Sequence, residues 1–126
     1  MIHGIGTDIC AVARMARMHA RHGERLARRL LSPAEQVEYS RASAPERLLA
    51  KRFAAKEAFG KAVGTGIRHP VTFAAISVSH DALGKPALEF APDLRDFLKA
   101  RRLRAHVSIS DEAEYAIAFV VIEREE

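Results

Sequence analysis

Two acidic residues, Asp8 and Glu57, have the types and settings of ligands for a hard divalent cation. Asp8 lies at the end of an expected strand, and Glu57 lies beside the apolar stripe of an expected long helix. Magnesium usually takes one or two carboxylates together with substrate phosphates. Asp8 and Glu57 would form such a site if the strand ends beside the helix. The simpler interpretation of Asp8 is a cap for the helix that follows it.

A lysine lies one helical turn after Glu57. Phe53, Glu57 and Lys61 are spaced four residues apart, so they share one face of the helix. In that position Lys61 would approach a phosphate held beside the metal. The simpler interpretation is an exposed Glu57–Lys61 pair, which stabilises a helix by only about 0.2–0.5 kcal/mol.

A strictly alternating segment, His106–Ser110, places His106, Ser108 and Ser110 on one strand face. These side chains would form either a row of donors for phosphate or base edges, or a solvated polar face. The similar segment Ser77–Asp81 leads into the turn Gly84-Lys85-Pro86, which indicates a hairpin strand without a site. Motifs of serine hydrolases and of helical zinc sites, G-x-S-x-G and H-x-x-x-H, are absent.

The segment from Ala11 to Leu30 carries six arginines and a single acid, Glu24. Spacings of three and four residues place most of these arginines along one helical stripe. A solvated face is the simplest interpretation, and an acidic partner is the functional one. The segment has no aromatic residue for stacking bases, so Met18 among the arginines favours an acidic helical protein over a nucleic acid. A basic nucleic-acid-binding module without catalysis remains the alternative.

The composition bounds the class of protein. Of the 126 residues 48% are hydrophobic, which excludes wholesale disorder and predicts a single domain over residues 1–126. The net charge is +4, no apolar run has the length of a membrane span, and the N-terminus does not resemble a signal peptide. Cys10 is the only cysteine, which excludes intrachain disulfides and makes a reducing, cytoplasmic setting the expectation.

The first half of the chain predicts a strand followed by helices. The strand runs from Ile2 to about Ile9, and a helix that Gly23 can interrupt covers residues 11–30. Ser32-Pro33-Ala34-Glu35 is a typical helix start with a capping box. Ser43-Ala44-Pro45-Glu46 resembles it and begins the longest helix, which ends near Val63 before Gly64.

The second half changes from helical to alternating periodicity. Strands are predicted at residues 75–79, 88–90, 106–110 and 115–122, with an amphipathic helix over residues 92–102 between the second and third of them. The last strand is almost wholly apolar, which indicates the middle of a sheet. The order β-α-α-α-β-β-α-β-β predicts an α+β domain.

Three motifs together resemble the holo-acyl-carrier-protein synthases, the small 4′-phosphopantetheinyl transferases. They are Gly4-Ile5-Gly6-Thr7-Asp8-Ile9, Arg52-Phe53-Ala54-Ala55-Lys56-Glu57-Ala58 and His106-Val107-Ser108-Ile109-Ser110. The resemblance runs from residue 1 to about residue 123. It implies transfer of the phosphopantetheine arm of coenzyme A to a serine of apo-acyl carrier protein, with release of adenosine 3′,5′-bisphosphate. It also implies a small antiparallel sheet packed against a long helix, magnesium as cofactor, and a homotrimer with shared sites. Asp111 departs from the family pattern, since many relatives carry histidine there.

The resemblance assigns roles residue by residue. Asp8 and Glu57 match the metal carboxylates, and Glu57 and Lys61 match the catalytic pair, with Lys61 near the pyrophosphate. The coenzyme A contacts match Arg52, Lys61, Lys85, Pro86 and His106. The carrier-docking helix matches Arg14, Met18, Arg21, Arg25 and Arg28. The general base stays open between Glu57 and a water on the metal, as does the pathway served, fatty acid or polyketide synthesis.

Overall fold

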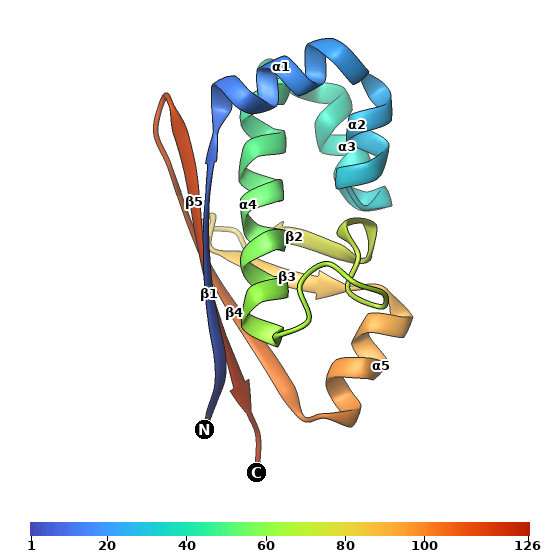
Figure 1. The fold of residues 1–126 in the computed structure, drawn as a ribbon, viewed down its shortest axis with the longest axis vertical. Helices are drawn as coiled ribbons and strands as arrows, with labels where there is room; N and C mark the ends of the chain where they lie inside the picture. Colours follow the sequence, from blue (N-terminus) through green and yellow to red (C-terminus); the bar gives the residue numbers. More distant parts are fainter.

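One long helix and a three-stranded sheet form the centre of the computed structural model, which describes residues 1–126 (Figure 1). The helices α1, α2 and α3 lie together at one end of this pair, and α5 lies at the other end. The elements, in chain order, are β1 (Ile2–Ala11), α1 (Val12–His22), α2 (Glu24–Leu30), α3 (Pro33–Arg41), α4 (Pro45–Val63), a short 3₁₀ turn (Phe73–Ala75), β2 (Ile76–His80), β3 (Pro86–Phe90), α5 (Pro92–Ala100), β4 (Leu103–Asp111) and β5 (Tyr115–Arg124).

The main sheet has the strand order β1-β5-β4, and both pairings are antiparallel. The apolar strand β5 therefore lies in the middle, as its sequence predicts. Every second residue of β5, from Ala116 to Ile122, is buried under α4, whereas the residues between them face outward. A separate hairpin pairs β2 with β3. The predicted α+β class is confirmed.

The strand β1 crosses α4 at a distance that only glycine permits. A Cβ atom on Gly4 would lie 2.0 Å from the carbonyl oxygen of Ala62, and one on Gly6 would lie 2.1 Å from that of Ala58. Both obstacles are helix backbone, which cannot move aside as a side chain would. The two glycines thus allow β1 to lie close against the helix, which places Asp8, two residues after Gly6, beside α4.

Gly6→Ala is therefore expected to destabilise the fold. The added methyl group must push β1 away from α4, and overpacking of this kind lowers the free energy of unfolding by about 1–3 kcal/mol or more. Urea denaturation would measure the change, with Leu83→Ala at the exposed tip of the β2–β3 turn as the control variant. Equal loss in both variants would show that the close approach is not the cause.

The helix starts and breaks follow the sequence predictions except at Ser43. Gly23, at a φ of 56°, divides residues 11–30 into α1 and α2. Ser32 and Glu35 form the predicted capping box, with both hydrogen bonds present. The analogous prediction for Ser43 is wrong, because α4 has Ala44 as its N-cap and no side-chain cap, although Pro45 opens the helix as expected.

The hairpin of β2 and β3 confirms that Ser77–Asp81 belongs to a turn-forming segment. The Asp81 carboxylate accepts hydrogen bonds from the backbone N–H groups of Leu83 and Lys85, both at 2.9 Å. These bonds lower the pKa of Asp81. None of the helices is long and apolar enough to cross a membrane.

Candidate active site

Asp8 lies on the inner face of the sheet, beside α4. Its side chain is 17% exposed, and Oδ1 lies 3.1 Å from Nζ of Lys61. The same ammonium donates to the carbonyl of Thr7 at 2.9 Å. The other carboxylate oxygen of Asp8, Oδ2, is buried and has no hydrogen-bond partner. A buried carboxylate oxygen without a donor is unusual and indicates a place for a cation.

Glu57 lies on α4 close enough to Asp8 for their charges to interact. The pKa of the Glu57 carboxyl is raised, mainly by burial and also by the neighbouring negative charge of Asp8. The positive charges of Lys61 and Arg14 act in the opposite direction but do not cancel this rise. Two carboxylates that disfavour each other's charge would both be stabilised by a cation between them. Asp8 therefore lies beside the long helix as expected, although it stands within β1 and not at its end, because the strand continues to Ala11.

The donor set fits magnesium. Asp8 and Glu57 supply two carboxylates, one of them with an unpaired buried oxygen, and no cluster of three or more His, Cys, Asp or Glu residues suited to a metal occurs in the structure. Magnesium is commonly held by one or two carboxylates, with its other positions taken by water and substrate phosphates. The pair therefore suits a metal that binds together with a phosphate substrate.

The simpler interpretations of these residues are wrong. Asp8 does not cap α1, because the N-cap is Ala11 and no side chain bonds to the helix start. Glu57 and Lys61 form no ion pair, because the Lys61 ammonium reaches across to Asp8 on β1. In this arrangement Lys61 holds the carboxylate of Asp8 and, being about half exposed, still faces solvent.

His106 lies on the opposite face of the sheet from Asp8. It is opposite Val121 on β5, and both residues are on the outward face, whereas Asp8 is opposite Ala118 on the inward face. Nε2 of His106 lies 2.5 Å from Oε1 of Glu123. A single chain therefore does not bring His106 to the Asp8–Glu57 pair.

Lys85 and Pro86 belong to the β2–β3 hairpin, outside the main sheet. Lys85 ends the turn: its carbonyl accepts from the backbone N–H of Asp81, and its own N–H donates to the Asp81 carboxylate. Pro86 begins β3. The Lys85 side chain is exposed. Neither residue contacts Asp8, Glu57 or Lys61 through a hydrogen bond or ion pair, so the structure keeps these predicted adenine contacts apart from the predicted metal site.

Arg52 lies inside the protein in this structure, and its contact with coenzyme A stays a prediction. Its side chain is only 3% exposed, and its guanidinium pairs with Glu38 at 3.0 Å and with Glu35 at 3.4 Å. The guanidinium of Arg52 therefore forms its ion pairs with these two carboxylates of α3, inside the protein. Arg52 is a buried structural residue here, because it projects from α4 toward α3 and not toward the surface.

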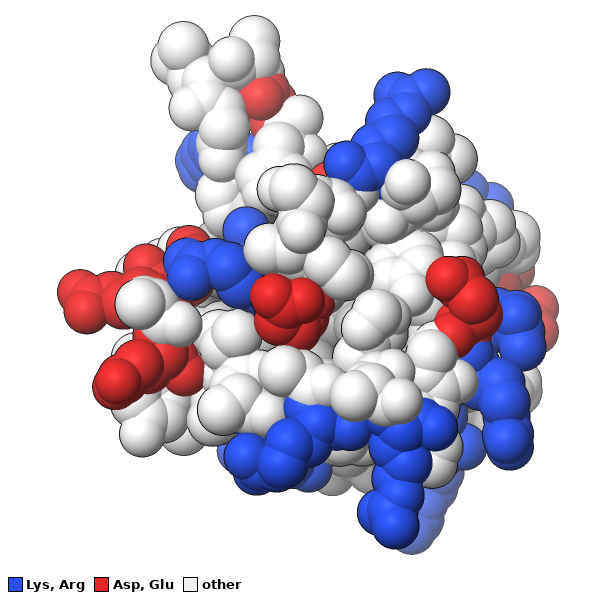
Figure 2. All heavy atoms as spheres, turned by 90° about the horizontal axis from the view of Figure 1, so that it is seen from above, with Lys and Arg blue, Asp and Glu red and all other residues white.

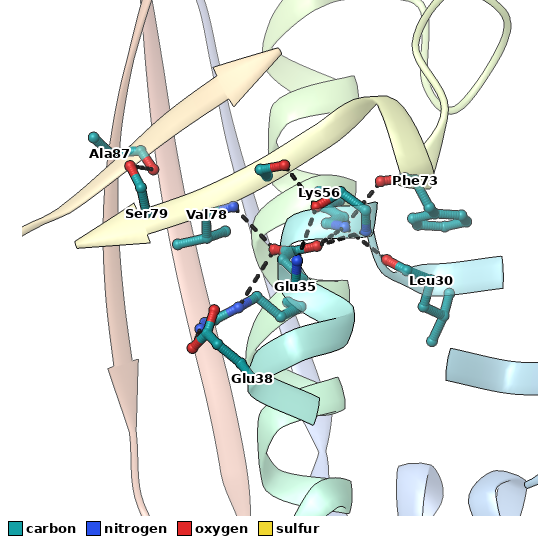
Figure 3. Close-up of polar contacts among 11 residues, drawn as sticks. Leu30, Glu35, Glu38, Lys56, Phe73, Val78, Ser79 and Ala87 are labelled. Carbon is teal, nitrogen blue, oxygen red and sulfur yellow. Dashed lines mark hydrogen bonds and ion pairs between the residues drawn. The ribbon is translucent and has the colours of Figure 1, made fainter. Parts of the chain in front are cut away.

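Arg52 is part of a buried ionic cluster that the sequence analysis did not identify (Figure 3). The fully buried ammonium of Lys56 donates to Oε1 of Glu35 at 2.6 Å and to the carbonyls of Leu30 and Phe73 at 2.7 and 2.8 Å. The other oxygen of Glu35 accepts from the backbone N–H of Val78 at 2.9 Å. The cluster thus joins α2, α3, α4 and β2 through one carboxylate and one ammonium.

Helical spacing contains the signal that could have revealed this cluster. Arg52 and Lys56 fall on the same stripe as Leu49, Phe59 and Val63, at intervals of three and four residues. Charged residues on an apolar stripe are buried only when they are paired. The nearest acids able to pair with them lie on the neighbouring helix α3, and its packing direction is not readable from the chain.

The predicted docking residues lie on the exposed side of α1 and α2. Met18 and Arg25 line a shallow groove of about 400 Å³ together with His22, Leu26 and Arg29. Figure 2 looks onto the end of the molecule that carries α1, and there Lys and Arg side chains project along the lower and right-hand edges, whereas several acidic side chains gather at the left. A groove that offers Met18 and Leu26 among exposed arginines suits an acidic partner with an apolar contact.

Arg14 differs from the other arginines of this surface. Its guanidinium lies over the ring of Phe53, 5.5 Å from the centroid, and its charge lowers the pKa of Glu57. Phe53 in turn stacks on Phe73 at 5.6 Å. Arg14 therefore links the arginine surface to the carboxylate pair, a position that the sequence spacing alone does not reveal.

Comparisons with known proteins match nearly the whole chain. A family model described as the 4′-phosphopantetheinyl transferase superfamily matches residues 4–120. The chain is 59% identical to a holo-[acyl-carrier-protein] synthase of Dechloromonas aromatica, with 98% of each chain covered. It superposes on the crystal structure of the Neisseria meningitidis synthase with a TM-score of 0.95 at 49% identity, covering 98% of this chain and 100% of that one. A Bacillus anthracis synthase solved in complex with CoA (3′,5′-ADP) has a TM-score of 0.81 at 38% identity, with 99% of both chains covered.

Proposed function

This chain belongs to the holo-[acyl-carrier-protein] synthases, and on that premise we propose how its residues carry out the family's reaction. The enzyme transfers the 4′-phosphopantetheine arm of coenzyme A to a serine of apo-acyl carrier protein. The serine oxygen attacks the β-phosphorus of the coenzyme A pyrophosphate, the bond from that phosphorus to the bridging oxygen breaks, and the serine proton passes to the Glu57 carboxylate or to water. Adenosine 3′,5′-bisphosphate leaves with the negative charge that builds up on its phosphate.

Asp8 and Glu57 hold the magnesium ion in this proposal. The single observation that carries it is the unpaired, buried Oδ2 of Asp8 beside the Glu57 carboxyl of raised pKa. When bound, magnesium stabilises charge on the phosphate oxygens. Lys61 holds Asp8 in place through its ion pair and presents a second positive charge to the pyrophosphate, which favours the same charge build-up.

The reaction itself is the first experiment. Apo-acyl carrier protein, coenzyme A and magnesium are incubated with the enzyme, and the intact mass of the carrier is measured with and without EDTA. We expect a gain of one phosphopantetheine mass that EDTA prevents. A gain that EDTA leaves unchanged would reject the metal, and no gain with a carrier that a related synthase does modify would reject this carrier as the substrate.

Docking of the carrier on the arginine surface is the next part of the proposal. Arg21→Glu combined with Arg25→Glu is expected to raise the KM for the carrier about tenfold or more at low salt, because these exposed charges steer an acidic partner. The KM for coenzyme A should not change. The matched control is Arg95→Glu combined with Lys99→Glu on α5, and equal effects of both pairs would reject a specific docking surface.

A homotrimer built on the outward face of the sheet completes the proposal. This face carries exposed apolar side chains, with exposed fractions from 43% to 60%, at Ile5, Ile9, Tyr115, Ile117 and Phe119. Strand register places Ile9 directly opposite Ile117, so the patch is continuous. His106 lies on the same face, which supports a site shared between neighbouring subunits.

Phe119→Asp is expected to break this assembly. A charge in the centre of the apolar patch would be buried without a partner in the trimer, and the enzyme should become monomeric in light scattering with mass detection. Leu83→Asp is the control, because Leu83 is exposed at the tip of the β2–β3 hairpin. A monomeric wild-type enzyme, or an unchanged mass for Phe119→Asp, would contradict the proposed trimer.

Two finer points stay predictions. A role in fatty acid synthesis and a cytoplasmic location are the expectations from the sequence, and both would follow from identification of the natural carrier. The alternative of a nucleic-acid-binding module has no support among the synthases that this chain resembles over nearly its whole length.

A further inference from the structure

A groove of about 430 Å³ lies at the end of the molecule away from α1, between α5, β3 and the start of β4. None of the residues that line it belongs to the predicted metal, coenzyme A or carrier sites. Its volume falls within the range of small-molecule sites in proteins. The floor is apolar and is formed by Leu88, Phe90, Leu98, Leu103 and Ala105.

The rim of this groove is strongly basic. Four cationic side chains, Arg95, Lys99, Arg102 and Arg104, stand against one carboxylate, Glu125. Glu125 pairs with Arg104 at 3.0 Å, whereas the other three cations form no ion pair in the structure. The charge that would complement this rim is therefore negative.

The backbone at Arg102 supports a binding role independently. Its φ of 58° is the only positive φ at a residue other than glycine in the chain. The backbone N–H of Arg102 donates to the carbonyl of Lys99, and its own carbonyl accepts from Glu125, so the turn is fixed from both sides. Glycine adopts this conformation without strain, as it does after α1 and α4, and strained residues of this kind gather at ligand sites. The conformation keeps a guanidinium on the rim.

The chemistry of the floor selects the class of ligand. Phe90 is the only aromatic residue in it, and its ring already packs on Phe59 at 5.1 Å, so the groove offers no free platform for stacking a base. The other floor residues are aliphatic. An aliphatic chain on the floor and an anionic group at the rim would satisfy both parts of the groove.

We propose that this groove binds a monomeric fatty acid, with the acyl chain along Leu88, Leu98 and Leu103 and the carboxylate among the rim cations, Arg102 foremost. A guanidinium and a carboxylate form a charge-assisted hydrogen bond. One acyl chain fits the small apolar floor of the groove, whereas docking of a helix or of a membrane surface would need a larger apolar area. The site is separate from Asp8 and Glu57, so its failure would leave the transferase proposal intact.

The test uses dodecanoate below its micelle concentration, titrated into the full-length enzyme by calorimetry, with leucine methyl groups followed by NMR. We expect saturable binding at one site per chain and shifts of the methyl signals of Leu88, Leu98 and Leu103. Dodecyltrimethylammonium, which has the same chain and the opposite charge, should bind at least tenfold more weakly.

Two matched variants separate a ligand contact from a structural role. Arg102→Gly is expected to weaken dodecanoate binding about tenfold while the melting temperature stays the same or rises, because glycine relieves the backbone strain. Arg101→Gln removes the same charge one residue earlier, where the guanidinium stacks on Phe97 at 3.7 Å outside the groove, and should bind as wild type does. Equal loss in both variants would overturn the proposal.

Three other results would also overturn it: no saturable binding of dodecanoate, shifts confined to the outward face of the sheet, or equal binding of the cationic amphiphile. Binding to vesicles of anionic phospholipid or to an acidic peptide, without binding of dodecanoate, would assign the groove to a different partner and reject the fatty acid.

Discussion

Asp8→Asn and Glu57→Gln are each expected to lower the rate of phosphopantetheine transfer by about 100-fold or more. A metal at a phosphoryl group contributes several kcal/mol of transition-state stabilisation, and each 1.4 kcal/mol corresponds to about tenfold in rate. The amides keep the shape of the side chains and remove the negative charge that would hold the cation. Single-turnover transfer to the carrier, at saturating coenzyme A, measures the change.

Stability provides the second readout for these variants. Because the pKa of Glu57 is raised by burial and by Asp8, its ionised form is disfavoured in the folded protein without metal. Glu57→Gln should therefore melt at the same temperature as the wild type or higher. Magnesium with coenzyme A should raise the melting temperature of the wild type and not that of either variant. Glu89→Gln, at an exposed position on β3, is the control. Full activity in both amide variants would reject the metal site.

Glu35→Gln is expected to produce the largest loss of stability, about 3–5 kcal/mol, because it leaves the buried ammonium of Lys56 without its counter-charge and leaves Arg52 paired with Glu38 alone. The carboxylate of Glu35 accepts from Lys56 at 2.6 Å and pairs with Arg52 at 3.4 Å, and its two oxygens also accept the backbone N–H groups of Ser32 and Val78. A glutamine amide would turn a donor toward groups that are themselves donors. Urea denaturation followed by circular dichroism measures the loss.

Glu38→Gln is the matched control for this variant. Glu38 pairs with the same arginine at 3.0 Å, but its side chain is 48% exposed. A partly exposed pair of this kind contributes only about 0–1 kcal/mol. Equal midpoints for Glu35→Gln and Glu38→Gln would show that the buried cluster does not stabilise the fold as its geometry indicates.

Local sequence patterns were sufficient for most elements of the fold. The nearly continuous apolar run of β5 predicts its central position, and Ser32 and Glu35 predict a helix start that the structure confirms. These signals are local, because capping, periodicity and turn formation involve residues that are neighbours in the chain. The wrong prediction for Ser43 arises where the cap depends on the path of the preceding loop, which is not local.

In the candidate site, too, the residues could be predicted from local sequence, whereas their mutual placement could not. Asp8, Glu57 and Lys61 follow from residue types and helical spacing, and the glycines of β1 permit the contact that brings them together. Their mutual placement, with Lys61 on Asp8 and not on Glu57, depends on the packing of β1 against α4. Arg52 shows what the motif alone does not predict: the motif suggests a ligand contact, whereas the side chain in this structure turns inward to α3.

The sequence by itself therefore determined the family, the class of reaction, the order of the elements and the carboxylates that suit a metal. Only the tertiary structure decided which charges are buried and which are free, since that depends on contacts between residues far apart in the chain. Lys56 is paired inside with Glu35, 21 residues away, whereas Lys61, on another side of the same helix, pairs with Asp8, 53 residues away, and stays half exposed. A helix turns by about 100° per residue, so neighbouring lysines on α4 face different surroundings that the packing alone supplies.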